Sequence, residues 1–440
     1  MRWRVLLGLF LSVSLFFSEG TLSVCGAEDL TDLGGALSTD LPGRHAIQAT
    51  APNVTAPEKV LAQTEGFPLF HRITTPKHGL GPSFVNSSCA GCHVNNGKGP
   101  ATFGSPSRHG SSMVVKVKPR GLLPDGSAAE VPGIGGQILD QSISKPIKRS
   151  VSVTWEEIQG RYPDGTTYSL RTPKVFIPKA YKLPRGTISS LRMTPPMFGM
   201  GLLEAIPDDV IAGWSDERDA NGDGISGRVN WVKDLSTGAY VVGRFGFKAT
   251  HPSVVQQTAS ALYHDMNITH PLFGAEKKRP EAPLETLHSM AIYLRLAGMP
   301  RARSQSDPLV LAGKGVFQRL QCDSCHKMTV TTGRHQDSEL SEQTIHPFTD
   351  LLLHDMGRGL ADRWSEFSAN GREWRTTPLW GLGFSRQLGK SKPLYLHDGR
   401  ARSIEEAILW HGGEAAGSQK AFMSSPKADR RALIAFLNSL

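Results

Sequence analysis

The spacing of apolar residues predicts strands in the middle of the chain. Apolar and polar residues alternate in the stretches MVVKVK (residues 113–118) and VSVTW (151–155), which is typical of short strands. The sequence PDG at residues 124–126 and again at 163–165 predicts turns that break these strands. We therefore expect some β-structure between about residues 110 and 185.

Helical spacing follows in the second half of the chain. Apolar residues at positions 284, 287, 291 and 294 predict a helix that ends before Gly298 and Pro300. Leu309, Val316 and Phe317 predict a second amphipathic helix, and apolar residues at 433, 436, 437 and 440 mark one face of a helix that closes the chain.

The first 27 residues resemble a secretory signal peptide. Arg2 and Arg4 precede an apolar run over residues 5–17, and small residues end the segment at Ala27. A lipid anchor on Cys25 is the alternative. An uncleaved membrane anchor is not expected, because the apolar run is shorter than the ~20 residues that span a bilayer. We expect an exported, periplasmic protein with no stable membrane insertion. Residues 28–60 have weak periodicity and are expected to form an extended arm or linker.

Two Cys-X-X-Cys-His motifs contain four of the five cysteines: CAGCH at residues 89–93 and CDSCH at 322–326. This motif is typical of c-type haem attachment, with two thiols for the porphyrin and a histidine for the iron. The sequence therefore predicts two covalently bound c-type haems. The attachment residues would be Cys89, Cys92, His93, Cys322, Cys325 and His326.

Other uses of paired cysteines fit less well. A zinc ribbon needs its two pairs roughly 15–20 residues apart, and these motifs are much farther apart. A thioredoxin-like pair does not explain a histidine after both motifs. A disulfide framework is typical of short secreted chains, not of 440 residues.

The length and the motifs divide the chain into two haem domains. We expect a first haem domain over residues 61–304, with an irregular β-containing insertion at about 110–250, and a C-terminal cytochrome c-like domain over 305–440. The predicted fold class is mainly α. The formal net charge of +9 is spread along the chain without a long basic run or a nucleic-acid motif, so we expect no nucleic-acid partner.

One histidine stands out as a second ligand for the C-terminal haem. The sequence SIEE at residues 403–406 predicts a capped helix start. On that helix Ile404, Ala407, Ile408 and His411 share one side. His411 is either a core histidine or an iron ligand, and a haem in the same domain favours the ligand.

The motifs and several further stretches resemble the superfamily of di-haem cytochrome c peroxidases and MauG. The likeness is strongest to its branch of di-haem oxidoreductases, sometimes labelled thiol oxidoreductases, and runs from about Gly66 to the end. The stretches that carry it are YLHDGR (395–400), SIEEAI (403–408), GMGLLEAIP (199–207), GRFGFKA (243–249), FTDLLLHDMG (348–357), RTTPLWG (375–381) and HGGEA (411–415).

The resemblance implies ligands and catalytic groups. In the peroxidases a methionine, and in MauG a tyrosine, ligates the second haem at the position that His411 takes here. The peroxidases place a distal histidine about sixteen residues after the first motif, where this chain has His109. His71 and His78 compete for that role, and an open iron is the remaining alternative.

Peroxide chemistry also needs an acid or base near the open iron. The peroxidases use a glutamate, and the candidates here are Glu156, Glu157 and Glu414.

Residues 219–224 (DANGDG) match the first half of an EF-hand calcium loop. Asp219, Asn221 and Asp223 would be the ligands, but position twelve is Asn230 in place of glutamate, so a plain turn is the alternative. The peroxidases hold a calcium near their haem pair.

Two functions follow from these expectations. In the first, the protein is a peroxidase-like oxidoreductase in which one haem does chemistry and the other passes electrons. Its partners would be a redox protein or a small oxidant such as peroxide. In the second, both irons only relay electrons between periplasmic partners. The label "thiol oxidoreductase" has no support, because no cysteine is left for thiol exchange.

Overall fold

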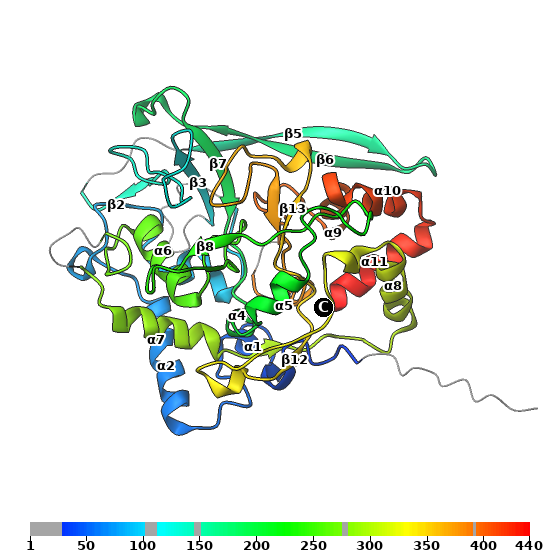
Figure 1. Ribbon diagram of the computed structural model, residues 1–440, viewed down its shortest axis with the longest axis horizontal. Helices are drawn as coiled ribbons and strands as arrows, with labels where there is room; N and C mark the ends of the chain where they lie inside the picture. Colours follow the sequence, from blue (N-terminus) through cyan, green and yellow to red (C-terminus); the bar gives the residue numbers. More distant parts are fainter. Residues whose placement is uncertain (1–28, 102–111, 145–150, 275–279, 390–392) are drawn as a thin grey trace, which may run out of the picture.

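The computed structural model describes residues 29–101, 112–144, 151–274, 280–389 and 393–440 (Figure 1). The predicted signal peptide lies outside these residues. None of the helices within them combines the length and the apolar composition that a bilayer span requires.

Eleven α-helices form in the described part of the chain, and the longer ones follow the apolar spacing. The predicted helices at 284–294, around 309–317 and at the chain end are confirmed as α7, α8 and α11. The helices are α1 (His45–Gln48), α2 (Pro57–His71), α3 (Cys89–Cys92), α4 (Met200–Glu204), α5 (Asp208–Gly213), α6 (Val254–Met266), α7 (Leu284–Arg295), α8 (Pro308–Arg319), α9 (Ile404–Leu409), α10 (Ala416–Ser424) and α11 (Lys427–Ser439).

The strands pair two by two. The longest pair is the antiparallel hairpin of β5 (Ser152–Arg161) and β6 (Thr167–Phe176), followed by β3 (Met113–Lys118) with β7 (Ile188–Met193). The short pairs are β1 (Ser38–Thr39) with β10 (Met299–Pro300), β2 (Ser83–Phe84) with β4 (Gln141–Ser142), β8 (Trp231–Lys233) with β9 (Tyr240–Val242), β11 (Val330–Thr331) with β12 (Thr344–Ile345), and β13 (Leu353–Asp355) with β14 (Glu373–Arg375).

The predicted fold class, mainly α, is wrong. The structure is 33% helix and 18% strand. The difference comes from the ten-residue strands β5 and β6, in which exposed charges such as Glu156 and Glu157 interrupt the alternation, and from two-residue strands too short to have any periodicity. Strands β3, β5 and β6 lie where the sequence predicts β-structure, but strands make up more of the fold than the apolar spacing indicates.

One large core runs through both predicted haem domains. Buried residues of α6, α7, α8 and α11 belong to the same apolar cluster, and a smaller cluster lies beneath β3 and β7. Residues of the expected arm or linker also join the core. Leu30, Leu33 and Leu37 are fully buried, and Ser38 pairs with Met299 in β1–β10.

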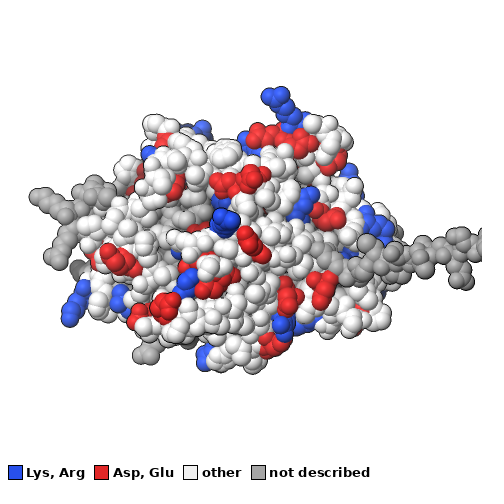
Figure 2. Space-filling model, turned by 60° about the horizontal axis from the view of Figure 1, so that its bottom comes forward, with Lys and Arg blue, Asp and Glu red and all other residues white. Residues whose placement is uncertain are grey.

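The elements surround two regions that hold the motifs (Figure 1). Helices α2, α6 and α7 lie beside the first motif, and the crossing of α8 over α11 lies beside the second. The β5–β6 hairpin runs along the top of the molecule as far as α9 and α10. On the face shown in Figure 2, basic and acidic side chains are interspersed, so the positive net charge is not gathered there.

Candidate functional site

The first motif forms a single helical turn, α3. Ser88 caps it by accepting a hydrogen bond from the Gly91 amide at 3.1 Å. A Cβ on Gly91 would lie 2.3 Å from the Asn86 side-chain oxygen, so a larger residue here would require Asn86 to move. The turn places both thiols on one side and leads directly into His93, whose Nδ1–H donates to the Pro195 carbonyl at 3.0 Å.

The second motif follows the end of α8, where Gln321 has a left-handed backbone with φ of 57°. The His326 amide donates to the Cys322 carbonyl at 3.0 Å, and its ring Nδ1–H donates to the Phe348 carbonyl at 2.9 Å. Phe317, from the core between α8 and α11, lies with its ring centre 6.4 Å from that of His326.

The two motif histidines are thus oriented in the same way. A carbonyl oxygen can only accept, so each Nδ1 carries the proton and each Nε2 is left with a lone pair. Burial lowers the pKa of both His93 and His326 to about 4, so both rings are neutral near pH 7. A ring nitrogen donating to a backbone carbonyl is the usual support for a metal-ligating histidine.

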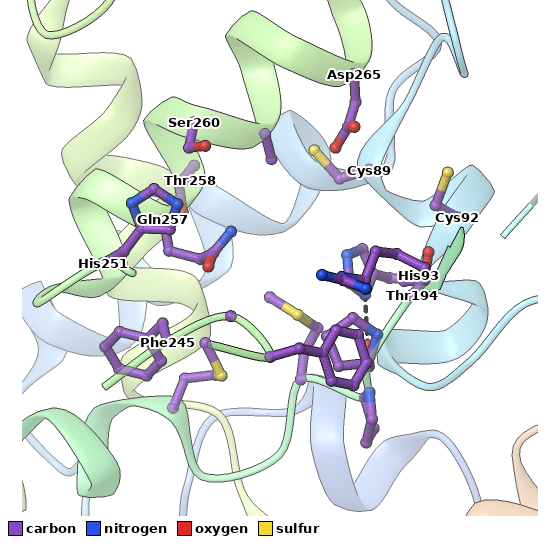
Figure 3. Close-up of a pocket in the computed structure, with 18 of the residues that line it drawn as sticks. Cys89, Cys92, His93, Thr194, Phe245, His251, Gln257, Thr258, Ser260 and Asp265 are labelled. Atoms are coloured by element: carbon purple, nitrogen blue, oxygen red, sulfur yellow. Dashed lines mark hydrogen bonds between the residues drawn. The ribbon is translucent and has the colours of Figure 1, made fainter. Parts of the chain in front are cut away.

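A cavity of about 260 Å³ adjoins the first motif (Figure 3). Cys89, Cys92 and His93 line it. Burial raises the pKa of Cys89 to about 12 and also raises that of Cys92, so both are thiols. Much of the remaining wall is apolar, including Phe70, Met197, Phe198, Leu203, Phe245 and Met290.

Four cations of the described residues also line this cavity: Lys116, Arg192, Lys248 and Arg375. Burial lowers the pKa of Lys248 to about 8 and that of Arg375 to about 10. An apolar wall, two thiols, an oriented imidazole and cations fit a porphyrin that has an apolar ring and two carboxylates. The residues present therefore fit haem at the first motif.

The wall opposite His93 contains a histidine that the sequence analysis did not single out. His251 and Gln257 lie across the cavity from His93 (Figure 3). His251 ends a tight loop in which the Phe245 amide donates to the His251 carbonyl at 2.9 Å and Gly246 has a φ of 80°. Gln257 lies in the first turn of α6, after the Ser253 cap.

Within the part of the chain that the structure describes, two carboxylates from separate segments also line the cavity. Burial raises the pKa of Asp265 to about 6, although it accepts a hydrogen bond from Gln137 at 2.6 Å. Burial would raise the pKa of Glu366 too, but the Lys116 charge and a hydrogen bond from the Trp364 indole at 2.8 Å hold it below its usual value.

Near the second motif, His411 follows helix α9. Ser403 caps that helix as predicted, accepting from the Glu406 amide at 3.1 Å. The His411 ring donates from Nδ1 to the Ala407 carbonyl at 2.7 Å, and burial lowers its pKa. His326 is close enough to His411 that a charge on His411 would lower the pKa of His326.

The neighbouring Trp410 has a buried indole nitrogen with no hydrogen-bond partner among the described residues. An unpaired buried donor is costly unless a ligand group satisfies it. Together with the neutral rings of His326 and His411, it fits a haem at the second motif as well.

A buried histidine beside the second motif also escaped prediction. His354 on β13 lies 2.7 Å from Glu414, 2.9 Å from Asp350 and 3.7 Å from the Cys325 sulfur. Burial by itself would lower the pKa of His354, but the bonds to Asp350, Cys325 and Glu414 raise it well above its usual value. His354 is therefore an imidazolium held between two carboxylates.

The predicted acid–base glutamates lie elsewhere. Glu156 is exposed and pairs with Lys174, and Glu157 pairs with Arg402 at 3.0 Å on the surface. Glu414 binds His354 and accepts from the Asp355 amide at 2.9 Å. None of the three lines the described cavity at the first motif.

The described histidines that compete as ligands of the first haem are not found at the cavity of the first motif either. His109 lies outside the described residues. His71 donates to the Phe67 carbonyl at 2.9 Å, and His78 lies 2.9 Å from the Thr75 hydroxyl. Neither lines the cavity that holds His93.

The calcium-like loop closes on itself. Asp219 accepts from the Gly224 amide at 3.1 Å, Asn221 from the Asp223 amide at 2.9 Å, and Asp223 from the Ile225 amide at 2.8 Å. The last two bonds are those of Asx turns, and the first closes the loop. The calcium site stays a prediction.

A comparison with protein families finds a match to the chain. The family model described as "Di-haem oxidoreductase, putative peroxidase" matches residues 136–280 and 277–440. No curated protein and no solved structure matches the chain.

Proposed function

Because the chain belongs to the di-haem oxidoreductase family, we propose that it is an exported c-type cytochrome that reduces peroxide. The two haems would be attached through Cys89 and Cys92 and through Cys322 and Cys325. Its partners would be a peroxide and a redox protein that delivers single electrons in the periplasm.

The matching orientation of His93 and His326 carries this proposal. In each motif two thiols precede a neutral imidazole whose Nδ1–H is held by a backbone carbonyl, at 3.0 Å and 2.9 Å. That arrangement leaves Nε2 with a lone pair, as an iron ligand requires. When bound, the haems supply iron that gains and loses single electrons and that binds peroxide where a coordination position is open.

The surroundings favour unequal roles for the two sites. His411 has the same Nδ1-to-carbonyl support as the motif histidines, which suits a second ligand and an electron-transfer haem. Lys116, Arg192, Lys248 and Arg375 would hold the carboxylates of the first haem. The polar wall formed by His251 and Gln257 suits that site to a small substrate.

A short path of bonds joins the two sites. The ring of His326 donates to the Phe348 carbonyl, and the next residue, Thr349, donates from its hydroxyl to the Thr376 carbonyl at 2.6 Å. Thr377, which follows, lines the cavity of the first motif. Electrons arriving at the second haem would therefore need to cross few gaps to reach the first.

Paired-cysteine variants test the proposal. Wild-type protein should keep the mass of two haems after denaturation, and Cys89→Ala/Cys92→Ala or Cys322→Ala/Cys325→Ala should each keep one. Reduced wild type should be oxidised by hydrogen peroxide, and the first-motif variant should not. Loss of haem on denaturation, or a reduced wild type that is inert to peroxide, would contradict the proposal.

A further inference from the structure

His251 has a ring nitrogen with no hydrogen-bond partner among the described residues. Its Nδ1 is buried, and no described residue lies within hydrogen-bond distance of it. The side chain lines the cavity on the side opposite His93, next to Gln257 (Figure 3). An unsatisfied buried polar atom destabilises the folded protein, so its retention beside a cavity points to a ligand that binds there.

His251 differs in this respect from the three histidines placed as iron ligands. His93, His326 and His411 each commit Nδ1 to a backbone carbonyl. Ligating histidines almost always have such a bond, because it fixes the ring. His251 lacks it, so its surroundings suit a ring that exchanges protons with a substrate better than a ring bound to iron.

The other titratable side chains on the cavity wall are already engaged. Glu366 binds the Trp364 indole and lies 3.6 Å from Lys116. His264 donates from Nδ1 to the Ser260 carbonyl at 2.9 Å and lies 3.6 Å from Glu130. Asp265 accepts from Gln137 on the side of the cavity that holds Cys89 (Figure 3).

The charge state of His251 also suits this role. Burial lowers its pKa to about 3, the Glu366 charge raises it, and charges on Lys116 and His264 lower it. The ring is neutral near pH 7 and can accept a proton at one nitrogen while it donates from the other. The negative Glu366 would stabilise the imidazolium formed in this way.

We infer that His251 is the acid–base residue for a hydroperoxide bound between it and His93. This inference rests on the proposed peroxidase function. His251 would take the proton from the peroxide oxygen nearer His93 and deliver it to the departing oxygen as the O–O bond breaks. With hydrogen peroxide, two electrons from the redox protein and two further protons from solvent complete the conversion to two molecules of water.

Two substitutions of His251 test the inference. His251→Gln keeps a polar side chain of similar size but cannot exchange a proton near pH 7, and His251→Ala leaves space for added imidazole. Each should slow peroxide-driven oxidation of the reduced protein by roughly 100-fold or more, and imidazole should restore part of the rate in the alanine variant. His288→Gln, an exposed change on α7, is the control and should react like wild type.

Cyanide binding supplies a readout that does not depend on turnover. Hydrogen cyanide must lose its proton to bind ferric iron as an anion, so both His251 variants should bind it more slowly than wild type, with unchanged resting spectra. A resting first haem that changes from low-spin to high-spin in His251→Ala would make His251 an iron ligand and overturn the inference.

The peroxide reaction separates failure of the proposed function from failure of the inference about His251. A wild type that does not react with peroxide refutes the proposed function itself. A wild type that reacts, with both His251 variants equally fast, refutes only the inference about His251. Loss of the reaction in His264→Gln and not in His251→Gln would assign the role to the neighbouring imidazole and overturn it too.

Discussion

Helices α8 and α11 cross at Gly313. The substitution Gly313→Ala adds one methyl group there and tests how closely the two helices pack. A Cβ on Gly313 would lie 2.1 Å from the Ala432 carbonyl oxygen and 2.7 Å from the Phe436 Cβ. Carbon atoms in contact are usually separated by ~3.5–4.0 Å. Gly313→Ala therefore requires the two helices to move apart beside the second motif.

Gly315, in the same helix, is the matched control. A Cβ there would meet nothing within 4 Å. Both alanine variants gain helix propensity of about 1 kcal/mol, so their difference isolates the clash. Overpacking typically costs about 1–3 kcal/mol. Gly313→Ala should accordingly be less stable than Gly315→Ala by about that amount.

Urea unfolding followed by far-ultraviolet circular dichroism measures this difference in the haem-loaded protein. Gly315→Ala should be as stable as wild type or more stable, and Gly313→Ala less stable than Gly315→Ala. Equal midpoints and slopes for the two variants would show that the helices do not cross as closely as described.

Three further predictions concern charged and ligating residues. Glu414→Ala removes one of the two carboxylates that hold His354 and leaves Asp350 as its counter-ion, so unfolding should become easier by about 1–3 kcal/mol while the folded fraction keeps its peroxide rate. A selective loss of rate would instead make Glu414 catalytic. Glu204, buried against Arg295, has a pKa lowered from 4.5 to about 2: burial opposes this shift, but hydrogen bonds from His335 and Arg295 outweigh it. The stabilising contribution of Glu204 is therefore present above pH 4.5 and lost as the pH falls toward 2. Glu204→Gln should weaken the pH dependence of the unfolding free energy between those values. An unchanged pH dependence would refute the pairing of Glu204 with Arg295. His411→Met should keep the second haem low-spin and raise its reduction potential, and an unchanged spectrum and potential would remove His411 as a ligand.

The periodicity of apolar residues predicted the long helices and strands that bury one side. Strand β3 and helices α7, α8 and α11 were recognised because each repeats apolar residues over several turns or pleats. The strands β1, β2, β4 and β10 have two residues each and leave no such pattern. Their pairing depends on residues far away in the chain, so the fold class could not be judged from local spacing.

The candidate sites divide in the same way. The motif cysteines and histidines were found because haem attachment needs them within five consecutive residues. His251 and His354 have no local signature, because each depends on a distant segment: His251 faces the first motif across a cavity, and His354 binds Glu414 as well as the nearby Asp350. The one sequence signal for His354 is its place in the stretch FTDLLLHDMG (348–357), which carries the resemblance to the di-haem oxidoreductases.

The proposed roles require two haems that differ in their open coordination positions. Electron paramagnetic resonance of the fully oxidised and half-reduced protein tests this most directly. We predict one low-spin signal, from the haem between His326 and His411, and one high-spin signal that cyanide converts to low-spin in wild type. Two low-spin irons in both states, neither of which binds cyanide, would contradict the assignment of the first haem as the site of chemistry.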